Sequence, residues 1–314
     1  MHISFWIVFN AAILLLLFLD LSVWNREGRV LELRHALLST GFWVALAFLF
    51  AGLIHYWMGA GKALEFVTGY VIEESLSVDN LFVFILLFRY FKVPAEQERT
   101  VLFWGILGAL AMRGVFIVAG VALVQRFHWI LYLFGAFLLY SGFKLFGEQQ
   151  EEPVDPSHNA LLRLTRRLVP VSEAYEGNRF FIRRAGRTLA TPLFIVLLVV
   201  ETTDILFATD SIPAVLAISH DPFIVYTSNA FAILGLRSMF FALSTHMKIF
   251  HYLNYGIAVV LMFIGAKMLI GYKYQIPTWV ALAVIASVLG LSILASVLFP
   301  KKEEEAASSA GPQG

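Results

Sequence analysis

Acidic residues stand inside an apolar stretch that is long enough to cross a membrane. Residues 193–218 carry Glu201, Asp204 and Asp210 in an otherwise apolar sequence. One carboxylate at the centre of a membrane helix costs about 2.5–3.5 kcal/mol on insertion scales, so three in one segment require a partner or a function. Carboxylate oxygens are hard donors that suit Mg²⁺, Mn²⁺ and Ca²⁺. The stretch therefore predicts a cation site within the membrane.

The same stretch contains Pro213, which predicts an interruption of its helix. Proline lacks the N–H that would bond the carbonyl of Thr209, and its ring pushes that turn open. Irregular backbone is tolerated in a membrane where it is buried in protein or lines a cavity. We expect a freed carbonyl next to Asp210 and Ser211, which would add oxygen donors to the site.

A second acidic segment repeats the spacing of the first. Glu73 and Asp79 are six residues apart, as are Asp204 and Asp210, and a polar residue follows the second acid in each pair. The midplane segments offer neither cysteine nor histidine, which argues against Cu⁺ and a dedicated Zn²⁺ site. The predicted metal-binding set consists of residues with oxygen-bearing side chains: Glu73, Asp79, Asn80, Glu201, Asp204, Thr209, Asp210 and Ser211.

Two arginines accompany these acids. The run GALAMRGVF has its counterpart in AILGLRSMF, which places Arg113 opposite Arg237. Because arginine cannot bind a cation, we expect both to balance charge or to gate the site. Glu74 has no counterpart in the second segment and is assigned to the same balancing or gating role. The competing interpretation is that the acids merely pair with the arginines and hold the helices together.

The acids also outnumber the arginines, which bears on mechanism. Carboxylates crowded together raise one another's pKa and take up protons. Exchange of a bound metal ion for protons is therefore a natural mechanism, and an oxyanion would be repelled by the same cluster.

An internal repeat organises the chain around this site. YLFGAFLLYSGFKLF aligns with YGIAVVLMFIGAKMLI, which places Gly142 and Lys144 opposite Gly265 and Lys267. Repeat one covers 62–147 and repeat two covers 191–272. Each contains three predicted spans, so the second copy would run the opposite way through the membrane. Inverted repeats with interrupted helices that meet near the midplane are typical of transporters.

The composition predicts an all-α polytopic membrane protein. The chain has 314 residues, of which 59% are hydrophobic and 14% charged, and its mean hydropathy is +0.77. A membrane crossing needs roughly 20 apolar residues. Nine segments meet this length, with segments three to five and six to eight forming the repeat: 3–24, 36–58, 64–88, 99–124, 128–147, 191–218, 223–245, 252–271 and 276–299.

The remaining segments complete the predicted organisation. Residues 1–300 form a single transmembrane domain, and the first segment is expected to be a retained span, since no basic n-region precedes it. Residues 148–190 are expected to form a polar, basic cytoplasmic loop with an amphipathic helix near 160–168. The tail, 301–314, reads as disordered. The absence of cysteine excludes disulfides and thiolate metal sites within the chain.

Basic residues set the predicted orientation. Lysines and arginines gather on one side of the predicted topology, with Lys62, Arg126 and Lys273 on the other. The positive-inside rule then predicts an outside N-terminus and a cytoplasmic C-terminus, in the cell inner (plasma) membrane. The expected partners are the lipid bilayer and a divalent metal ion, with no nucleic acid and no resident cofactor.

Two motifs resemble a known family. EESLSVDNLFVF in segment three and VVETTDILFATDSIPAVLAI in segment six are similar to those of the TerC family of integral membrane proteins. The resemblance covers residues 20–300 and is greatest to the manganese-exporting Alx branch. It implies export of Mn²⁺ through an acidic site that falls here on Glu73, Asp79, Asn80, Glu201, Asp204 and Asp210. Some relatives are linked to tellurite resistance, a role that the charge of the site opposes.

The sequence thus predicts a carrier that exports divalent cations, foremost Mn²⁺, and is not an enzyme. The main alternative is a scaffold for a membrane stress complex or for membrane-protein assembly, without transport activity. An intramembrane aspartyl protease ranks last, because the chain lacks a GxGD setting and has more acids than a catalytic dyad requires.

Overall fold

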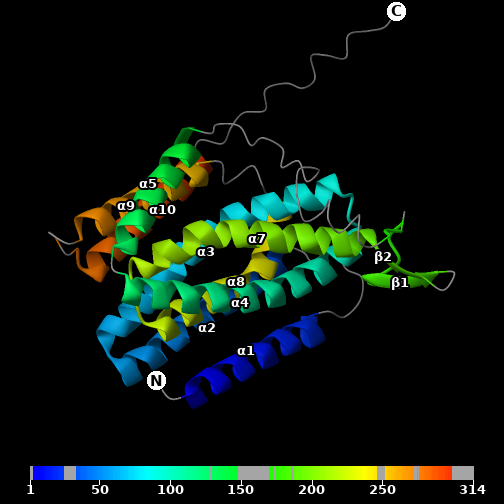
Figure 1. The fold of residues 1–314 in the computed structure, drawn as a ribbon, viewed down its shortest axis with the longest axis horizontal. Helices are drawn as coiled ribbons and strands as arrows, with labels where there is room; N and C mark the ends of the chain where they lie inside the picture. The colour runs from blue at the N-terminus through cyan, green and yellow to red at the C-terminus, as the bar shows by residue number, and fades with distance from the viewer. Residues whose placement is uncertain are drawn as a thin grey trace, which may run out of the picture.

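The computed structural model describes residues 3–24, 33–127, 129–147, 170–172, 174–184, 187–245, 252–271, 274 and 276–298. This part of the chain is mostly helical, with a two-stranded hairpin projecting from one end (Figure 1). The elements are α1 (Ile3–Trp24), α2 (Leu33–Met58), α3 (Ala60–Tyr90), α4 (Ala95–Arg126), α5 (Ile130–Gly147), β1 (Phe181–Arg184), β2 (Arg187–Ala190), α7 (Pro192–Leu216), α8 (Pro222–Thr245), α9 (Leu253–Ile270) and α10 (Thr278–Leu298). Each predicted apolar segment coincides with one of these helices. The largest differences are the starts of α3 and α4, which come four residues earlier than expected.

Most of the described helices contain apolar stretches that suit a membrane. Five of them, α2, α4, α7, α9 and α10, are long and apolar enough to cross a membrane, and α1, α5 and α8 contain shorter apolar stretches. Large apolar side chains such as Val115 and Leu206 are more than half exposed on the outside of the bundle. An apolar surface of this extent fits contact with lipid tails. The number of nine crossings stays a prediction.

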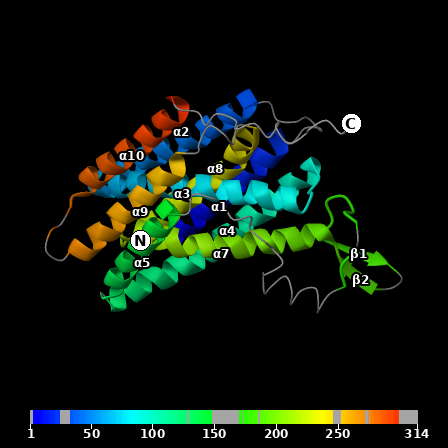
Figure 2. The same cartoon turned by 90° about the horizontal axis from the view of Figure 1, so that it is seen from above.

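Four helices form the central bundle. α3 packs against α7 and α8, and α4 packs against the same two helices (Figure 2). Long apolar helices whose hydrophobic residues surround the axis can be buried on several sides. The bundle buries polar residues from all four helices, and these residues form the candidate site.

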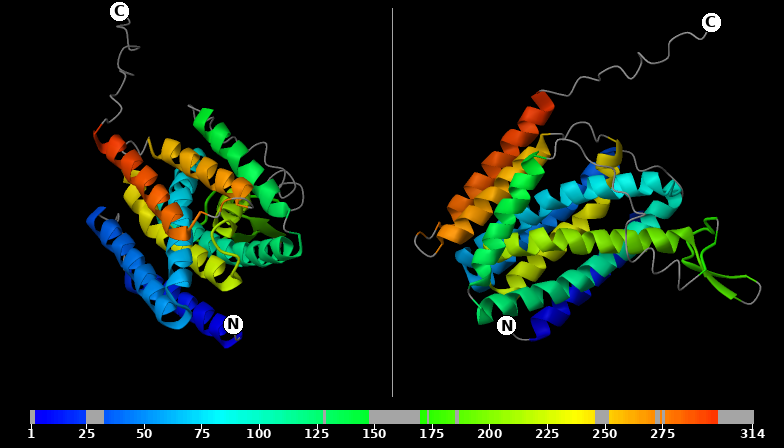
Figure 3. Two further views of the ribbon diagram at one scale, coloured as in Figure 1. Left: turned by 90° about the vertical axis from the view of Figure 1, so that its left-hand side faces the viewer. Right: turned by 45° about the horizontal axis from the view of Figure 1, so that its top comes forward.

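The other helices pack around this bundle in two groups. α2 packs against α3 and α8, and Phe9 of α1 meets the rings of Phe223 and Phe231 on α8. α5, α9 and α10 form the second group at one end of the molecule (Figure 3). In that group the backbones of α5 and α9 approach closely, because Gly135 and Gly265 face each other without side chains.

α7 is continuous, so the interruption predicted at Pro213 is wrong. Residues 192–216 form one helix with Pro213 inside it. Pro213 lies in the last turn, and its own carbonyl accepts from Ala217 N–H at 3.0 Å. A proline this close to the end of a helix disturbs few helical residues, because the helix ends within one turn after it. α3 is one continuous helix as well.

The loop between α5 and α7 contains strands that were not predicted. β1 and β2 pair antiparallel, from Phe181 opposite Ala190 to Arg184 opposite Arg187. The hydroxyl of Tyr175 donates to the Phe91 carbonyl at 2.8 Å, so this segment is held against the turn between α3 and α4. Burial raises the pKa of the Tyr175 hydroxyl. The amphipathic helix expected near 160–168 and the tail at 301–314 lie outside the described residues.

Candidate metal site

A buried arginine lies at the centre of the four-helix bundle. Arg113 of α4 donates from Nε to Oδ2 of Asp204 at 3.1 Å and from Nη2 to Oδ1 of the same carboxylate at 2.9 Å. Its Nη1 donates to Oε1 of Glu73 on α3 and, at 3.3 Å, to Oδ1 of Asn229 on α8. One residue from each helix of the bundle therefore meets at a single guanidinium. We call Arg113, Glu73, Asp204 and Asn229 the Arg113 cluster.

The Arg113 cluster is closed to solvent. Arg113 is 1% exposed, Glu73 0% and Asp204 4%. Two carboxylates and one guanidinium leave one formal negative charge when all three are ionised. Charges removed from water to this extent are tolerated when they are paired and hydrogen-bonded, and the bidentate contact with Asp204 meets this condition. Glu73 and Asp204, which the sequence alignment places at equivalent positions, thus both contact Arg113.

Several polar atoms beside the cluster have no partner among the described residues. They are Oε2 of Glu73, Nδ2 of Asn229, Nδ2 of Asn80 and Oγ of Ser77, and all are buried. Buried polar groups are paired in most proteins, so each exception calls for an explanation such as a ligand or a water molecule. Glu73, Ser77 and Asn80 come from one face of α3, three to four residues apart. This face can supply oxygen donors to a cation.

Asp210 lies away from the Arg113 cluster, towards α5. Its Oδ1 accepts a hydrogen bond from Oγ of Ser141 at 2.9 Å. The next residue, Ser211, is buried, and its Oγ has no partner in the described part of the chain. Thr209 is exposed and donates to the Leu206 carbonyl at 2.6 Å, so its hydroxyl is engaged within α7.

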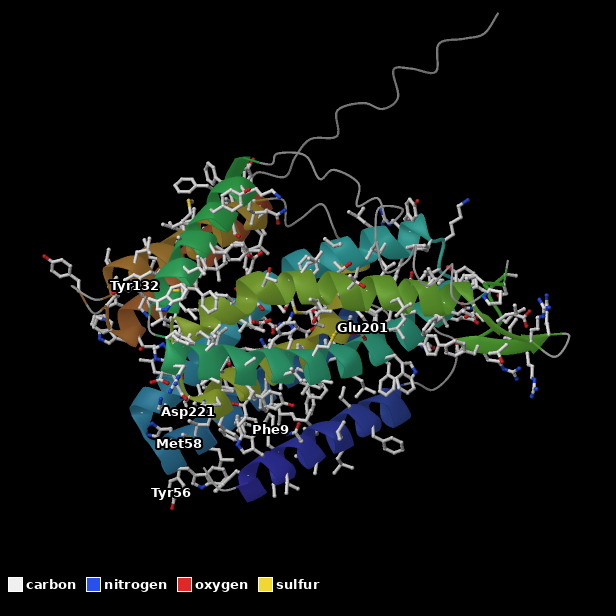
Figure 4. All side chains as sticks on the ribbon, in the orientation of Figure 1. Phe9, Tyr56, Met58, Tyr132, Glu201 and Asp221 are labelled. Atoms are coloured by element: carbon white, nitrogen blue, oxygen red, sulfur yellow. The ribbon has the colours of Figure 1, made fainter. Side chains whose placement is uncertain are left out.

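Glu201 occupies a place of its own between α7 and α4. A Cβ added to Gly108 of α4 would overlap its carboxylate, so the carboxylate rests directly on the α4 backbone. Oε2 of Glu201 is buried without a partner in the described structure. Figure 4 shows Glu201 in the middle of the bundle, between the ribbons of α7 and α4.

The residues assigned to charge balance have different surroundings. Glu74 lies beside Tyr70, whose hydroxyl is hydrogen-bonded to it, and over Gly235 of α8. Arg113 is ion-paired with Glu73 and Asp204, and its balancing or gating role stays a prediction. The backbones of Asp79 and Arg237 lie in α3 and α8, but their side chains lie outside the described structure.

The predicted acids are therefore spread along the bundle rather than gathered at one point. Within the described part of the chain, no three His, Cys, Asp or Glu side chains come close enough together to hold a metal ion. Two partners were missed from the sequence, Asn229 and Ser141. Asn229 ends the polar run Thr227–Ser228–Asn229 in an otherwise apolar segment, and that run was the signal that could have identified it. Ser141 carried no comparable signal.

A polar cavity of about 600 Å³ lies where α3 begins and α7 ends. Glu65 sits in its wall and accepts hydrogen bonds from Nζ of Lys62 at 2.7 Å and from Oγ of Ser219. His220 and Asp221 line the same cavity, and Figure 4 shows Asp221 at this end of the bundle. Further acidic groups therefore lie in this cavity, at one end of the four-helix bundle.

Comparison with known proteins agrees with this architecture. A model of the integral membrane protein TerC family matches residues 58–304. The "Uncharacterized membrane protein STKORF319" of Myxococcus xanthus is 49% identical over 293 residues, 93% of this chain and 92% of its own. The "Putative membrane-bound redox modulator Alx" of Escherichia coli K12 is 41% identical over 298 residues, 92% of each chain. No solved structure matches the chain. The family match and these relatives show that this multi-pass chain belongs to the TerC family of integral membrane proteins.

Proposed function

We propose that this protein exports divalent metal cations, foremost Mn²⁺, from the cytoplasm through the acidic interior of its four-helix bundle. One observation carries the proposal. Glu73 and Asp204, at matching positions of the two sequence repeats, are buried together in the centre of the bundle. Ionisable groups inside membrane segments are costly and rare, and substrate and ion pathways are among the functions that they mark.

The chemistry around these acids favours a hard cation. Carboxylates, the amides of Asn80 and Asn229 and the hydroxyl of Ser77 are the donors within the bundle. Oxygen donors of this kind suit Mn²⁺, Mg²⁺ and Ca²⁺ rather than soft metals. Two oxygens of this set, Oε2 of Glu73 and Oγ of Ser77, are unpaired in the described structure, which gives the set the capacity to accept a cation.

The inverted repeat supports a carrier mechanism in this proposal. Under the repeat alignment α3 corresponds to α7, α4 to α8 and α5 to α9. The packing of α3 on α8 then matches that of α7 on α4. In the second group, Gly135 contacts Gly265. The repeat alignment places Gly135 opposite Ala258 and Gly142 opposite Gly265. The contact of Gly142 with the backbone at Ala258 is therefore the same contact with the two repeats exchanged. Such symmetry allows two half-units to rock about a fixed central site.

In this proposal the metal ion passes from the Arg113 cluster to acids that lie outside it. Glu201 and Asp210 follow one another along α7 towards the cavity that contains Glu65 and Asp221. With the N-terminus outside, this cavity opens on the outer face, where an exporter releases its metal ion. Protons taken up by the same acids would exchange for the metal, which is the coupling we propose.

Two non-transport functions compete with this proposal. The Arg113 network supports a scaffold, since paired buried charges can lock helices together. The name of the Alx relatives suggests redox modulation for those proteins. This chain contains no cysteine, so thiol–disulfide chemistry on its own side chains is excluded.

Metal content of living cells separates these functions. The wild-type protein, expressed in a bacterium without its own Mn²⁺ exporters, is expected to lower cell-associated Mn²⁺ and to raise Mn²⁺ tolerance. Asp79→Asn and Asp210→Asn, at matched membrane abundance, are expected to lose both effects. Unchanged Mn²⁺ content with the wild-type protein present in the membrane would favour the scaffold.

A further inference from the structure

The Arg113 guanidinium occupies the space in which a cation bound to Asp204 would have to sit. Both oxygens of Asp204 accept from it, at 2.9 and 3.1 Å, and Oε1 of Glu73 accepts from it as well. A divalent cation approaches carboxylate oxygens to about 2.0–2.6 Å. A metal ion chelated by both oxygens of Asp204 would need the side of the carboxylate that now faces the guanidinium. Chelation of a metal ion there and the bidentate contact with Arg113 therefore compete for the same place.

Arg113 cannot leave these acids by losing its proton. A guanidinium stays charged in proteins, so it makes way for a metal ion only by moving. It also repels a cation at short range inside a medium that screens poorly. Its departure requires another acceptor within reach.

Glu201 provides such an acceptor. It stands three residues before Asp204 on the continuous helix α7, and side chains at this spacing lie on one face about 5–6 Å apart. Oε2 of Glu201 is buried without a partner in the described structure, and its carboxylate lies against Gly108 of α4, the helix that also carries Arg113.

We propose that Arg113 is a tethered cation that fills the metal site when the site is empty, and that metal binding displaces its guanidinium from Asp204 towards Glu201. The inference rests on the proposed function. In this inference Arg113 competes with the transported ion for Asp204. Glu201 accepts the guanidinium after the metal ion has displaced it. Arg113 then offsets part of the negative charge of the buried acids when the carrier holds no metal ion.

Binding of Mn²⁺ to the purified full-length protein, measured by electron paramagnetic resonance, tests this inference. Arg113→Gln removes the competing charge and is expected to lower the Kd for Mn²⁺ by about tenfold or more. Arg126→Gln, at the exposed end of the same helix, is the matched control and is expected to bind as the wild type does. An unchanged or higher Kd for a folded Arg113→Gln protein would overturn the inference.

A second variant decides the matter if Arg113→Gln fails to fold. Arg113→Lys keeps the charge that the buried acids require, but an ammonium lacks the bidentate fork and is easier to displace. Its Kd for Mn²⁺ should fall below the wild-type value. An unchanged or higher Kd in folded Arg113→Lys would overturn the inference.

Competition by a free cation separates displacement from a structural effect. In Arg113→Ala, ethylguanidinium is expected to raise the apparent Kd for Mn²⁺ in proportion to its concentration, while the wild type does not respond. A merely structural arginine would be rescued by ethylguanidinium without competition, which would count against the inference. Failure of the wild type and of every variant to bind Mn²⁺ would contradict the proposed function and the inference with it.

Discussion

The carboxylate of Glu201 on α7 fills the space that a side chain at position 108 of α4 would take. Gly108 has no Cβ, and one added there would overlap the carboxylate. An ionisable group thus rests on the backbone of a neighbouring helix within a bundle whose surface is apolar. The glycine therefore sets where this carboxylate lies between α7 and α4.

Gly108→Ala should reduce transport more than stability. The new methyl group meets only the flexible end of Glu201, so the carboxylate can move aside at a cost of about 1–3 kcal/mol. Moving the carboxylate displaces a group on the proposed path, and Mn²⁺ flux should fall several-fold. Gly290→Ala on α10, where a Cβ meets open space, is the control and should leave flux and thermal stability unchanged. Normal flux in Gly108→Ala would remove Glu201 from the path.

Asp210→Asn should abolish Mn²⁺ transport while leaving the protein folded. Asparagine keeps the shape of the side chain and an oxygen that can accept from Ser141, but it removes the charge. Flux measured in proteoliposomes, together with the melting temperature in detergent, checks both parts. Glu176→Gln neutralises an acid in the segment before β1 and serves as the control. Wild-type flux in Asp210→Asn would show that this acid does not bind the ion.

The close approach of α5 and α9 predicts sensitivity to larger residues. A Cβ at Gly265 would lie 2.7 Å from the Gly135 carbonyl oxygen and 2.8 Å from the Leu139 nitrogen, and neither backbone atom can move alone. Gly265→Val should therefore destabilise the protein by about 1–3 kcal/mol. Gly41→Val on α2, which faces open space, should cost less than half as much. Equal melting temperatures for the two variants would contradict this packing.

The natural absence of cysteine allows a direct test of orientation. Lys62→Cys places a thiol at the start of α3, and Arg183→Cys places one on β1. With the N-terminus outside, a membrane-impermeant maleimide should label the first in intact cells and the second only after permeabilisation. The cysteine-free parent protein is the control. The reverse pattern would invert the topology and place the Glu65 cavity inside the cell.

The sequence was most informative where apolar length alone decides the structure. Helices such as α1 and α9 coincide with their predicted segments almost to the residue, since a membrane span needs a long apolar run. Equal spacing in the two segments singled out Glu73 and Asp204, and both of these acids contact Arg113 in the structure. The need to balance buried acids is the reason for which a balancing role is predicted for Arg113.

Other features depend on tertiary packing that the sequence does not display. Pro213 leaves α7 intact because only three helical residues follow it, so its position in the helix mattered more than its presence. Asn229 and Ser141 act through contacts with helices far away in the chain, which local patterns do not reveal. The hairpin at 181–190 was hidden by a basic composition typical of loops.

The central claim is that buried acids of the bundle carry Mn²⁺ across the membrane, and flux into sealed proteoliposomes of known orientation tests it most directly. The comparison is between the wild type, Asp204→Asn and the exposed control Arg126→Gln, each reconstituted at equal protein density. We predict saturable Mn²⁺ flux for the wild type and the control, and flux at the level of empty liposomes for Asp204→Asn. Wild-type flux no greater than that of empty liposomes, or full flux in Asp204→Asn, would contradict the account.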